Sequence, residues 1–291
     1  MTRIKGKFAK LLVVILAMLG IFLSIGSHKA YAMPFYDLSP QKLCLRAEFS
    51  TTFANSSAER KSNIALATRS IDKYFLDVNG EFSFNRVVGA RTQKRGYKTA
   101  KIIVGGKFID GVGGGVCQVS TTLYNAVLLA GLKITEYHPH SLAVSYIEPS
   151  FDAMVNSNSA DLRFENITRN PIIIYATATE TMVKFSIYGE PMKEKFVRES
   201  IVKEYISPPE DEIIIDTKNE YPDLYEGEKQ VLTYPKEGLI SQANLLKVKN
   251  GKVVKIKEIR KDKYAPIRRV LIIGTSPRPE ESENMPIENK N

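Results

Sequence analysis

The chain has few of the residues that build metal sites: two cysteines and three histidines among 291 residues. Catalytic zinc usually has three firm protein ligands, and the spacing of 21 positions from Cys117 to His138 matches no diagnostic ligand spacing. A zinc site formed by Cys117, His138 and His140 therefore stays a minor alternative. We expect the protein to work without a metal or another cofactor.

Long apolar runs are scarce, and the one at the N-terminus is short for a membrane span. Four Lys or Arg residues precede the 15 residues Leu11–Ile25, and Ala30-Tyr31-Ala32 has small residues at the spacing of a signal-peptidase site. Spanning the hydrocarbon core takes about 20 residues. We predict a signal peptide over residues 1–32 and an extracytoplasmic protein, in the cell wall or secreted. An uncleaved membrane anchor is the alternative.

Strong net charge is lacking as well. Residues 1–32 carry five Lys or Arg and no acidic residue, so cleavage changes the formal charge from +9 to +4. That charge is too small to indicate nucleic acid as a target. It suits an anionic cell wall or membrane surface, and we expect membrane contact only through the signal segment if it stays uncleaved.

The two cysteines allow one disulfide at most. An even number of cysteines in an exported protein permits a bond between Cys44 and Cys117. Such a bond would exclude Cys117 as a nucleophile. A domain that already has a good core does not need this single link for stability, and the sequence leaves the redox state of the pair open.

The most informative stretch is GVGGGVCQVSTTLY, residues 111–124. Gly113–Gly115 lack the Cβ atoms that forbid unusual backbone angles, so the chain can turn sharply there. After this turn, apolar residues recur at helical spacing up to Ala130, and Gly131 is placed as a stop. Cys117 then lies in the first turn of a helix, where free N–H groups and the helix dipole favour a thiolate. It is a candidate nucleophile, with a buried structural cysteine as the alternative.

Histidine supplies the candidate base. His28 lies in the targeting segment, whereas His138 and His140 follow the cysteine helix in the sequence HPHS. A cysteine with an available histidine is the minimum apparatus for acyl transfer. Residues two apart in an extended segment share a face, so either histidine is a candidate, with His140 preferred, and either can also be structural. Asp152 can orient the imidazole, although a turn-forming aspartate is the more common case.

Backbone N–H groups at the start of this helix can hold an oxyanion. We assign Gly115, Cys117 and Gln118 to this role, with Gln118 as a possible side-chain donor, and we place Gly114 beside them in substrate binding. The run Ser120–Thr122 is more typical of local backbone hydrogen bonding than of catalysis. Four basic residues are expected on a solvated loop rather than on the substrate: Arg86, Arg91, Lys94 and Arg95.

The first part of the chain predicts an α+β domain. The segment after the Ser56–Glu59 capping box has helical spacing and predicts a long helix over residues 58–76. Gly105-Gly106 predicts a two-residue hairpin. Strands are predicted over residues 43–53, 143–147, 161–167, 172–179 and 182–188. The result is an antiparallel sheet with one long and one short glycine-led helix, ending near Gly189–Pro191.

The second part has a different character. Residues 200–275 alternate apolar and charged positions in short strands, and turn signals such as Glu237-Gly238 and Asn250-Gly251 separate them. This pattern predicts a small all-β module. Residues 276–291 are polar and contain proline, so we expect a disordered tail.

From about residue 47 to 188 the chain resembles the VanW family. The most specific match is GGGVCQVSTTLYNAVLLAGL, residues 113–132, followed by HPHS and the pair Asp152-Ala153. The resemblance implies a catalytic domain over residues 33–190, with Cys117 as the nucleophile of a peptidoglycan L,D-transpeptidase, the activity now ascribed to some clostridial members. Residues 200–275 are similar to the five-glycine module of wall enzymes and adhesins, which implies wall binding, with a plain spacer as the alternative.

These expectations meet in one reaction. We hypothesise that Cys117 attacks the third residue of a peptidoglycan stem peptide, expels the terminal D-alanine and passes the acyl group to a second stem, forming a 3-3 cross-link. The partners are then stem peptides and wall glycan. Two alternatives stay open: an L,D-carboxypeptidase that uses the same cysteine, and a wall-binding protein without catalysis in which the glycine-cysteine turn is a structural corner.

Overall fold

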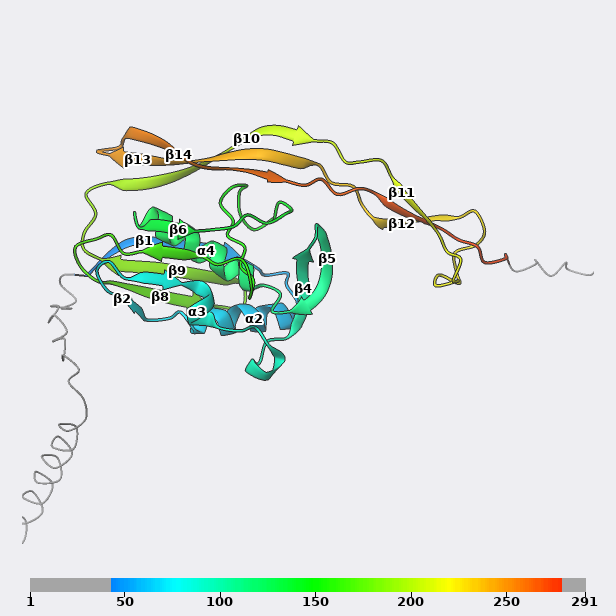
Figure 1. Cartoon of the computed structure of the whole chain (residues 1–291), viewed down its shortest axis with the longest axis horizontal. Coiled ribbons are helices and arrows are strands. Elements are labelled where there is room, and N and C mark those ends of the chain that lie inside the picture. Colours follow the sequence, from blue (N-terminus) through cyan, green and yellow to red (C-terminus); the bar gives the residue numbers. More distant parts are fainter. Residues whose placement is uncertain (1–42, 279–291) are drawn as a thin grey trace, which may run out of the picture. The chain divides into compact units, whose positions relative to one another are not determined.

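An antiparallel sheet with the strand order β1–β9–β8–β2 forms the frame of the first part of the chain (Figure 1). A computed structural model describes residues 43–278, so the predicted signal peptide and most of the predicted tail lie outside the described residues. The four strands are β1 (Cys44–Thr52), β9 (Met182–Gly189), β8 (Ile172–Ala178) and β2 (Tyr74–Leu76). Side chains of β8 are alternately buried and exposed, so only one face of the sheet is covered.

The long predicted helix is shorter than expected. Helix α2 (Ala58–Arg69) begins after Ser57, whose side chain accepts a hydrogen bond from the N–H of Arg60, and it ends well before the predicted boundary at residue 76. Lys73 has a φ of 60°, and residues 74–76 pair with β8 instead of continuing the helix. The helical spacing of apolar residues is misleading here because pairing with the sheet outweighs local propensity.

Helix α4 (Val116–Leu129) is the predicted glycine-led helix, with Cys117 in its first turn. Together with α2 it covers the inner face of the sheet, and it also contacts strand β10 (Lys195–Ile206) of the second part. Leu123 and Val127 have no exposed surface, which places the helix within the core rather than on its edge. Gly131 follows with a φ of 72° and ends the helix as predicted.

Smaller elements complete this part. Strands β3 (Glu81–Ser83), β7 (Arg163–Glu165) and β6 (Lys133–Glu136) form a second antiparallel sheet. Helix α3 (Phe84–Val88) and the 3-10 turn η1 (Gln93–Arg95) precede the hairpin of β4 (Thr99–Val104) and β5 (Lys107–Val112), which turns at Gly105-Gly106 as predicted.

The strand predicted over residues 143–147 is absent. The segment that contains it has no regular structure between His138 and Phe151. Its carbonyl groups bind partners outside any ladder: Ser141 accepts from the N–H of Ala265, and Ala143 accepts from Nζ of Lys236. Contacts with the second part of the chain therefore replace the sheet pairing that the β-branched and aromatic residues suggested.

The second part is all-β, as predicted. Three strands pair in the order β10–β13–β14 and run side by side in Figure 1: β10 (Lys195–Ile206), β13 (Gly238–Lys249) and β14 (Lys252–Tyr264). A second sheet contains β11 (Glu212–Ile215), β15 (Val270–Ile273) and β12 (Lys229–Thr233). The strands β10, β13 and β14 have 12 or 13 residues and are longer than predicted, and β10 begins before residue 200.

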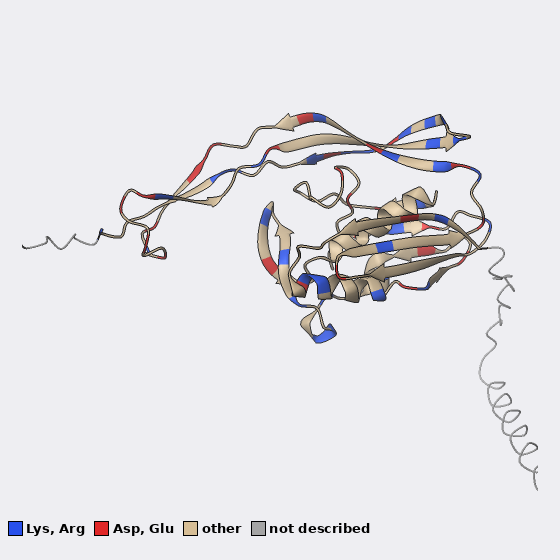
Figure 2. Ribbon diagram, turned by 180° about the vertical axis from the view of Figure 1, so that it is seen from behind, with Lys and Arg blue, Asp and Glu red and all other residues tan. Residues whose placement is uncertain are grey.

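The two parts share a core. Ala243 of β13 is fully buried within the same apolar cluster as Leu123 of α4. In contrast to this apolar core, the turn that joins β13 to β14 is rich in lysine (Figure 2). The α+β prediction is confirmed at the level of class, with three α-helices and mainly antiparallel strands among the described residues. None of the helices in residues 43–278 is long and apolar enough to cross a membrane.

Candidate active site

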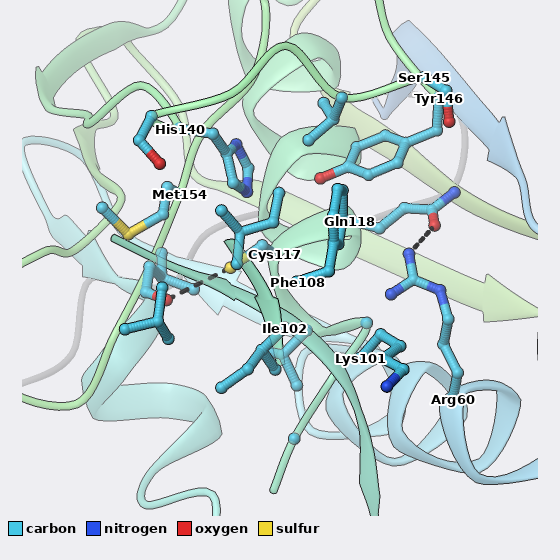
Figure 3. A pocket seen from close by; sticks show the side chains of 18 of the residues that line it. Arg60, Lys101, Ile102, Phe108, Cys117, Gln118, His140, Ser145, Tyr146 and Met154 are labelled. Carbon is cyan, nitrogen blue, oxygen red and sulfur yellow. Dashed lines mark hydrogen bonds between the residues drawn. The ribbon is translucent and has the colours of Figure 1, made fainter. Parts of the chain in front are cut away.

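A pocket of about 1220 Å³ opens above the N-terminus of α4 (Figure 3). Its walls come from the first turn of α4, the β4–β5 hairpin, the irregular segment after Pro139 and the loop of residues 154–157. Two lysines of the second part, Lys236 and Lys263, also line it. The candidate cysteine and one of the two candidate histidines therefore face a space large enough for a peptide.

The glycine turn fixes where α4 starts. Gly115, the residue before the helix, has a φ of 106°, a left-handed conformation that a side chain disfavours. Gly114 lies so close to β4 that a Cβ atom would be 2.6 Å from the carbonyl oxygen of Lys101. The turn is therefore pressed against β4, which brings Cys117 to the floor of the pocket.

Cys117 is partly buried, and its Sγ lies 3.3 Å from the carbonyl oxygen of Val155 (Figure 3). Burial raises the pKa of the thiol, but the hydrogen bond and charge of His140, together with the charge of Arg91, outweigh it, so the pKa of Cys117 is below its ordinary value. Cys44 and Cys117 are both free, so the disulfide that would exclude a nucleophile is not formed.

His140 is the histidine that faces Cys117 (Figure 3). Its ring is buried, and Nδ1 lies 2.7 Å from Oδ2 of Asp152. Burial alone lowers the pKa of His140, but the hydrogen bonds to Asp152 and Cys117 and their negative charges raise it to about 9. The two shifts therefore have directions that favour a thiolate on Cys117 and an imidazolium on His140.

Asp152 is almost completely buried, yet it is ionised. Its Oδ2 accepts hydrogen bonds from both the backbone N–H and Nδ1 of His140. Its Oδ1 accepts from the hydroxyl of Tyr264 and from Arg260. Burial raises the pKa of Asp152, and these partners outweigh that effect and lower it. The predicted third member of the triad thus lies where it can orient His140.

His138 lies apart from this group. Its Nε2 is 2.9 Å from Oε1 of Glu136, and its ring is about one-third exposed at 37%. The shared face predicted for His138 and His140 is not found, because the segment that carries them is irregular rather than an extended strand. The structure brings together Cys117, His140 and Asp152, and it gives His138 a different partner.

The structure limits the candidate oxyanion donors to backbone N–H groups at the start of α4. Within residues 43–278 the backbone N–H of Cys117 has no hydrogen-bond acceptor, whereas that of Gln118 donates to the carbonyl of Gly115. The side chain of Gln118 is not a free donor, because it accepts from Arg60 and donates to the Thr52 carbonyl and the Thr51 hydroxyl. Gln118 ties α4 to α2 and β1, which is a different role from the predicted one.

Residues of the run Ser120–Thr122 form hydrogen bonds with backbone groups, as predicted. Ser120 donates to the carbonyl groups of Cys117 and Ala153, and Thr121 accepts from the N–H of Ala153. These bonds fix the segment that contains Asp152 against α4. They are structural, since both hydroxyl side chains are fully buried.

Two pocket residues do not follow from the sequence. Arg91 is predicted on a solvated loop, but its guanidinium is partly buried, 2.8 Å from Oδ1 of Asn85, and its charge lowers the pKa of Cys117. Tyr146 points its hydroxyl into the pocket beside Gln118 (Figure 3). Burial and the nearby Cys117 raise the pKa of Tyr146, so this hydroxyl keeps its proton. No pattern in the sequence identifies either residue, because the irregular backbone places both.

Lys and Arg side chains line the pocket without a matching carboxylate among the described lining residues. Five cationic side chains are among its lining residues, and no Asp or Glu of the described chain is: Arg60, Arg91, Lys101, Lys236 and Lys263. Such a wall attracts ligands that carry carboxylates and repels cationic ones.

Comparison with known proteins identifies the part of the chain that carries this site. Residues 59–188 match the family model described as VanW like protein. This stretch forms a VanW domain. It includes Cys117, His140 and Asp152, and the resemblance read from the glycine-cysteine block is confirmed.

Two curated relatives share the VanW domain. The uncharacterized protein YoaR of Bacillus subtilis is 45% identical over 139 residues, covering 48% of this chain and 45% of YoaR. The vancomycin B-type resistance protein VanW of Enterococcus faecalis is 25% identical over 134 residues, covering 44% of this chain and 48% of that protein. The chain thus spans about half the length of the curated relatives it matches.

Two solved structures are similar to the other part. The G5 domain of IgA1 protease has 24% sequence identity and a TM-score of 0.20, covering 28% of this chain and 90% of its own. The G5 domain of HP0197 has 19% identity and a TM-score of 0.16, covering 28% of this chain and 100% of its own.

Proposed function

We propose that the protein is an exported cysteine acyltransferase that acts on peptidoglycan stem peptides as an L,D-transpeptidase. One observation carries the proposal: a cysteine of lowered pKa, a buried histidine and a buried aspartate form a chain of contacts on the floor of a pocket. A glycine-cysteine turn with a purely structural role does not require an imidazole next to the thiol. Such groupings of perturbed titratable residues in a pocket are typical of catalytic sites.

The first half-reaction breaks an amide bond. The Cys117 thiolate attacks the carbonyl carbon of the third stem residue, a diaminopimelate, and the carbonyl oxygen becomes an oxyanion. The free N–H of Cys117 and the protonated hydroxyl of Tyr146 are the donors available to that oxyanion. His140 then gives its proton to the departing amine, D-alanine leaves, and a thioester remains on Cys117.

The second half-reaction restores the enzyme. An amine of a second stem attacks the thioester carbonyl, His140 takes a proton from that amine, and the carbon–sulfur bond breaks. The products are a 3-3 cross-link and the free Cys117 thiolate. The amide bond broken in the first step provides the free energy for the amide bond made in the second, so no nucleotide is required outside the membrane.

The pocket wall agrees with this substrate. A stem peptide carries carboxylates on D-alanine and on diaminopimelate, and five cationic side chains are among the residues that line the pocket of Cys117. The relative from Enterococcus faecalis is named for vancomycin resistance, a trait of cell-wall synthesis, and this supports a role of the VanW domain at the wall.

A test of this function is product analysis with purified residues 33–291 and a disaccharide-tetrapeptide. We expect cross-linked dimers that lack one D-alanine from the wild type and from Cys44→Ala, and none from Cys117→Ala. Monomeric tripeptide without dimers would indicate an L,D-carboxypeptidase, in which water replaces the acceptor amine. Unchanged substrate with folded, reduced wild type would favour the wall-binding alternative.

A further inference from the structure

The carboxylate behind His140 is held from two directions by residues far apart in the sequence. Oδ2 of Asp152 binds His140, which lies 12 residues earlier. Oδ1 binds Tyr264 and Arg260, which lie more than 100 residues later, on β14. Half of the hydrogen bonding of this aspartate therefore comes from the all-β part of the chain.

These contacts are buried and specific. The Tyr264 hydroxyl donates to Oδ1 of Asp152 at 2.5 Å and accepts from the backbone N–H of Ser150 at 2.7 Å. The side chain of Arg260 has no exposed surface, and its Nη1 donates to the carbonyl oxygen of Asp152 at 2.6 Å. Burial of a carboxylate requires such partners, because an unpaired buried charge is strongly unfavourable.

Arg260 is itself held in place. Its Nε donates to Asp262 at 2.7 Å, and its guanidinium lies 4.3 Å from the centre of the Tyr137 ring. The cation is fixed by a carboxylate of its own strand and by an aromatic ring of the VanW domain. It cannot turn away from Asp152 without losing both contacts.

The same part of the chain forms a wall of the pocket. Lys236 and Lys263 line it, and Nζ of Lys236 donates to the carbonyl of Ala143 in the irregular segment. Ser241 of β13 contacts Ser150 through their hydroxyl groups. The segment between His140 and Asp152 is thus held between the VanW domain and strands β13 and β14.

We propose that residues 195–278, the C-terminal module, are a working part of the active site, in which Arg260 and Tyr264 are positioning residues that hold Asp152 against His140. This module is then more than the wall-binding accessory or spacer that the sequence suggested. The proposal rests on the assignment of Cys117 and His140 as the reacting pair.

Loss of these donors has a definite consequence. Without the Tyr264 hydroxyl, Oδ1 of Asp152 keeps only the longer 3.4 Å contact with Arg260. The buried carboxylate then rotates or takes a proton, and its hydrogen bond to Nδ1 of His140 weakens. His140 becomes less basic and stabilises the Cys117 thiolate less. The titratable and charged groups near the thiol are His140, Arg91 and Tyr146, and none of them is changed directly.

The test is the pH profile of Cys117 alkylation in residues 33–291, with Cys44→Ala as the background so that one thiol reports. We compare Tyr264→Phe, which removes only the hydroxyl, with the parent protein, using iodoacetamide. We expect the acid limb to move up by about one pH unit, which slows alkylation about tenfold below the pKa. Arg260→Gln is expected to move it in the same direction.

Two control variants separate positioning from docking of the module. Ser200→Ala removes a hydrogen bond from β10 to the carbonyl of Pro149 without touching Asp152, and Tyr234→Phe removes a hydroxyl from a residue that is 77% exposed. Both should keep the parent profile. Circular dichroism checks that each variant is folded. If Arg260→Gln is not folded, the comparison rests on Tyr264→Phe alone.

The outcomes distinguish this proposal from the function on which it rests. A parent protein with a lowered thiol pKa and a Tyr264→Phe variant with the same profile would overturn the positioning role. A shifted profile in Ser200→Ala equal to that of Tyr264→Phe would also overturn it, because general loosening of the module would then be the cause. A parent protein with an ordinary thiol pKa contradicts the proposed function instead.

Discussion

Reactivity at Cys117 depends on the residue opposite it. The thiol is partly buried, which by itself disfavours the thiolate, and the imidazolium of His140 reverses this effect. His140 in turn keeps its proton up to about pH 9 because Asp152 and Cys117 both favour the charged ring. The three residues therefore determine one another's charge, and a change in one appears in the titration of the others.

His140→Ala tests this pairing. Without the imidazolium, burial dominates, so the pKa of Cys117 should rise to its ordinary value of about 8.5 or above. We expect alkylation at pH 7 to slow by about tenfold or more, measured with iodoacetamide in a Cys44→Ala background. His138→Ala is the matched control, since His138 pairs with Glu136, and equal slowing in both variants would refute the pairing with His140.

The pH dependence of turnover follows from the same charges. Activity requires a thiolate and a protonated imidazole together, so it should rise as pH passes the lowered pKa of Cys117 and fall as pH passes about 9, where His140 loses its proton. The quantity to measure is kcat/KM for the disaccharide-tetrapeptide against pH. A profile that keeps rising above pH 9 would mean that His140 is not the acid.

At the scale of elements, the glycine turn determines where the helix begins. Gly114→Ala places a Cβ 2.6 Å from the carbonyl oxygen of Lys101, a backbone atom of β4 that cannot move aside cheaply. We expect a loss of about 1–3 kcal/mol in the free energy of unfolding, measured by urea denaturation, together with lower activity. Gly105→Asn is the control, because a Cβ added there would have no atom within 4 Å and asparagine tolerates a φ of 56°. Equal losses in both would contradict the clash.

The elements also show which parts of the fold can be predicted from local sequence patterns. Helix α4 and the Gly105-Gly106 hairpin follow from periodicity and turn residues, and the structure has both. The strand at Tyr74–Leu76 and the irregular segment at 143–147 do not follow, because pairing with β8 and hydrogen bonds to the C-terminal module determine them. Local patterns predict an element well where its own residues provide most of its stability.

Across the whole molecule, some residues of the candidate site can be predicted from the sequence and others cannot. Cys117, His140 and Asp152 are close in sequence and have recognisable chemistry, so the sequence predicts all three. Arg260 and Tyr264 do not follow from it, because nothing in an alternating strand indicates which side chain meets a carboxylate more than 100 residues away. Only the packing of β14 against the VanW domain reveals them.

The cationic pocket is a property of the whole molecule too, since both parts of the chain contribute to it. Lys263→Gln removes one charge from the pocket wall without changing the residues around Cys117. We expect KM for the disaccharide-tetrapeptide to rise about twofold to fivefold with little change in kcat, as for a single exposed ion pair. Lys255→Gln, the same change on β14 near the β13–β14 turn, should leave KM unaltered. A higher KM in both variants would point to overall charge rather than to the pocket.

If Cys117 carries the acyl group, the mass of the intact protein increases by that group during the reaction. Wild-type residues 33–291 are mixed with disaccharide-tetrapeptide, quenched in acid and measured by mass spectrometry, with Cys117→Ala treated in parallel. We expect an adduct equal to the donor without its D-alanine, located on Cys117 and missing from the variant. Turnover by Cys117→Ala at the wild-type rate, or the same adduct on another residue, would contradict it.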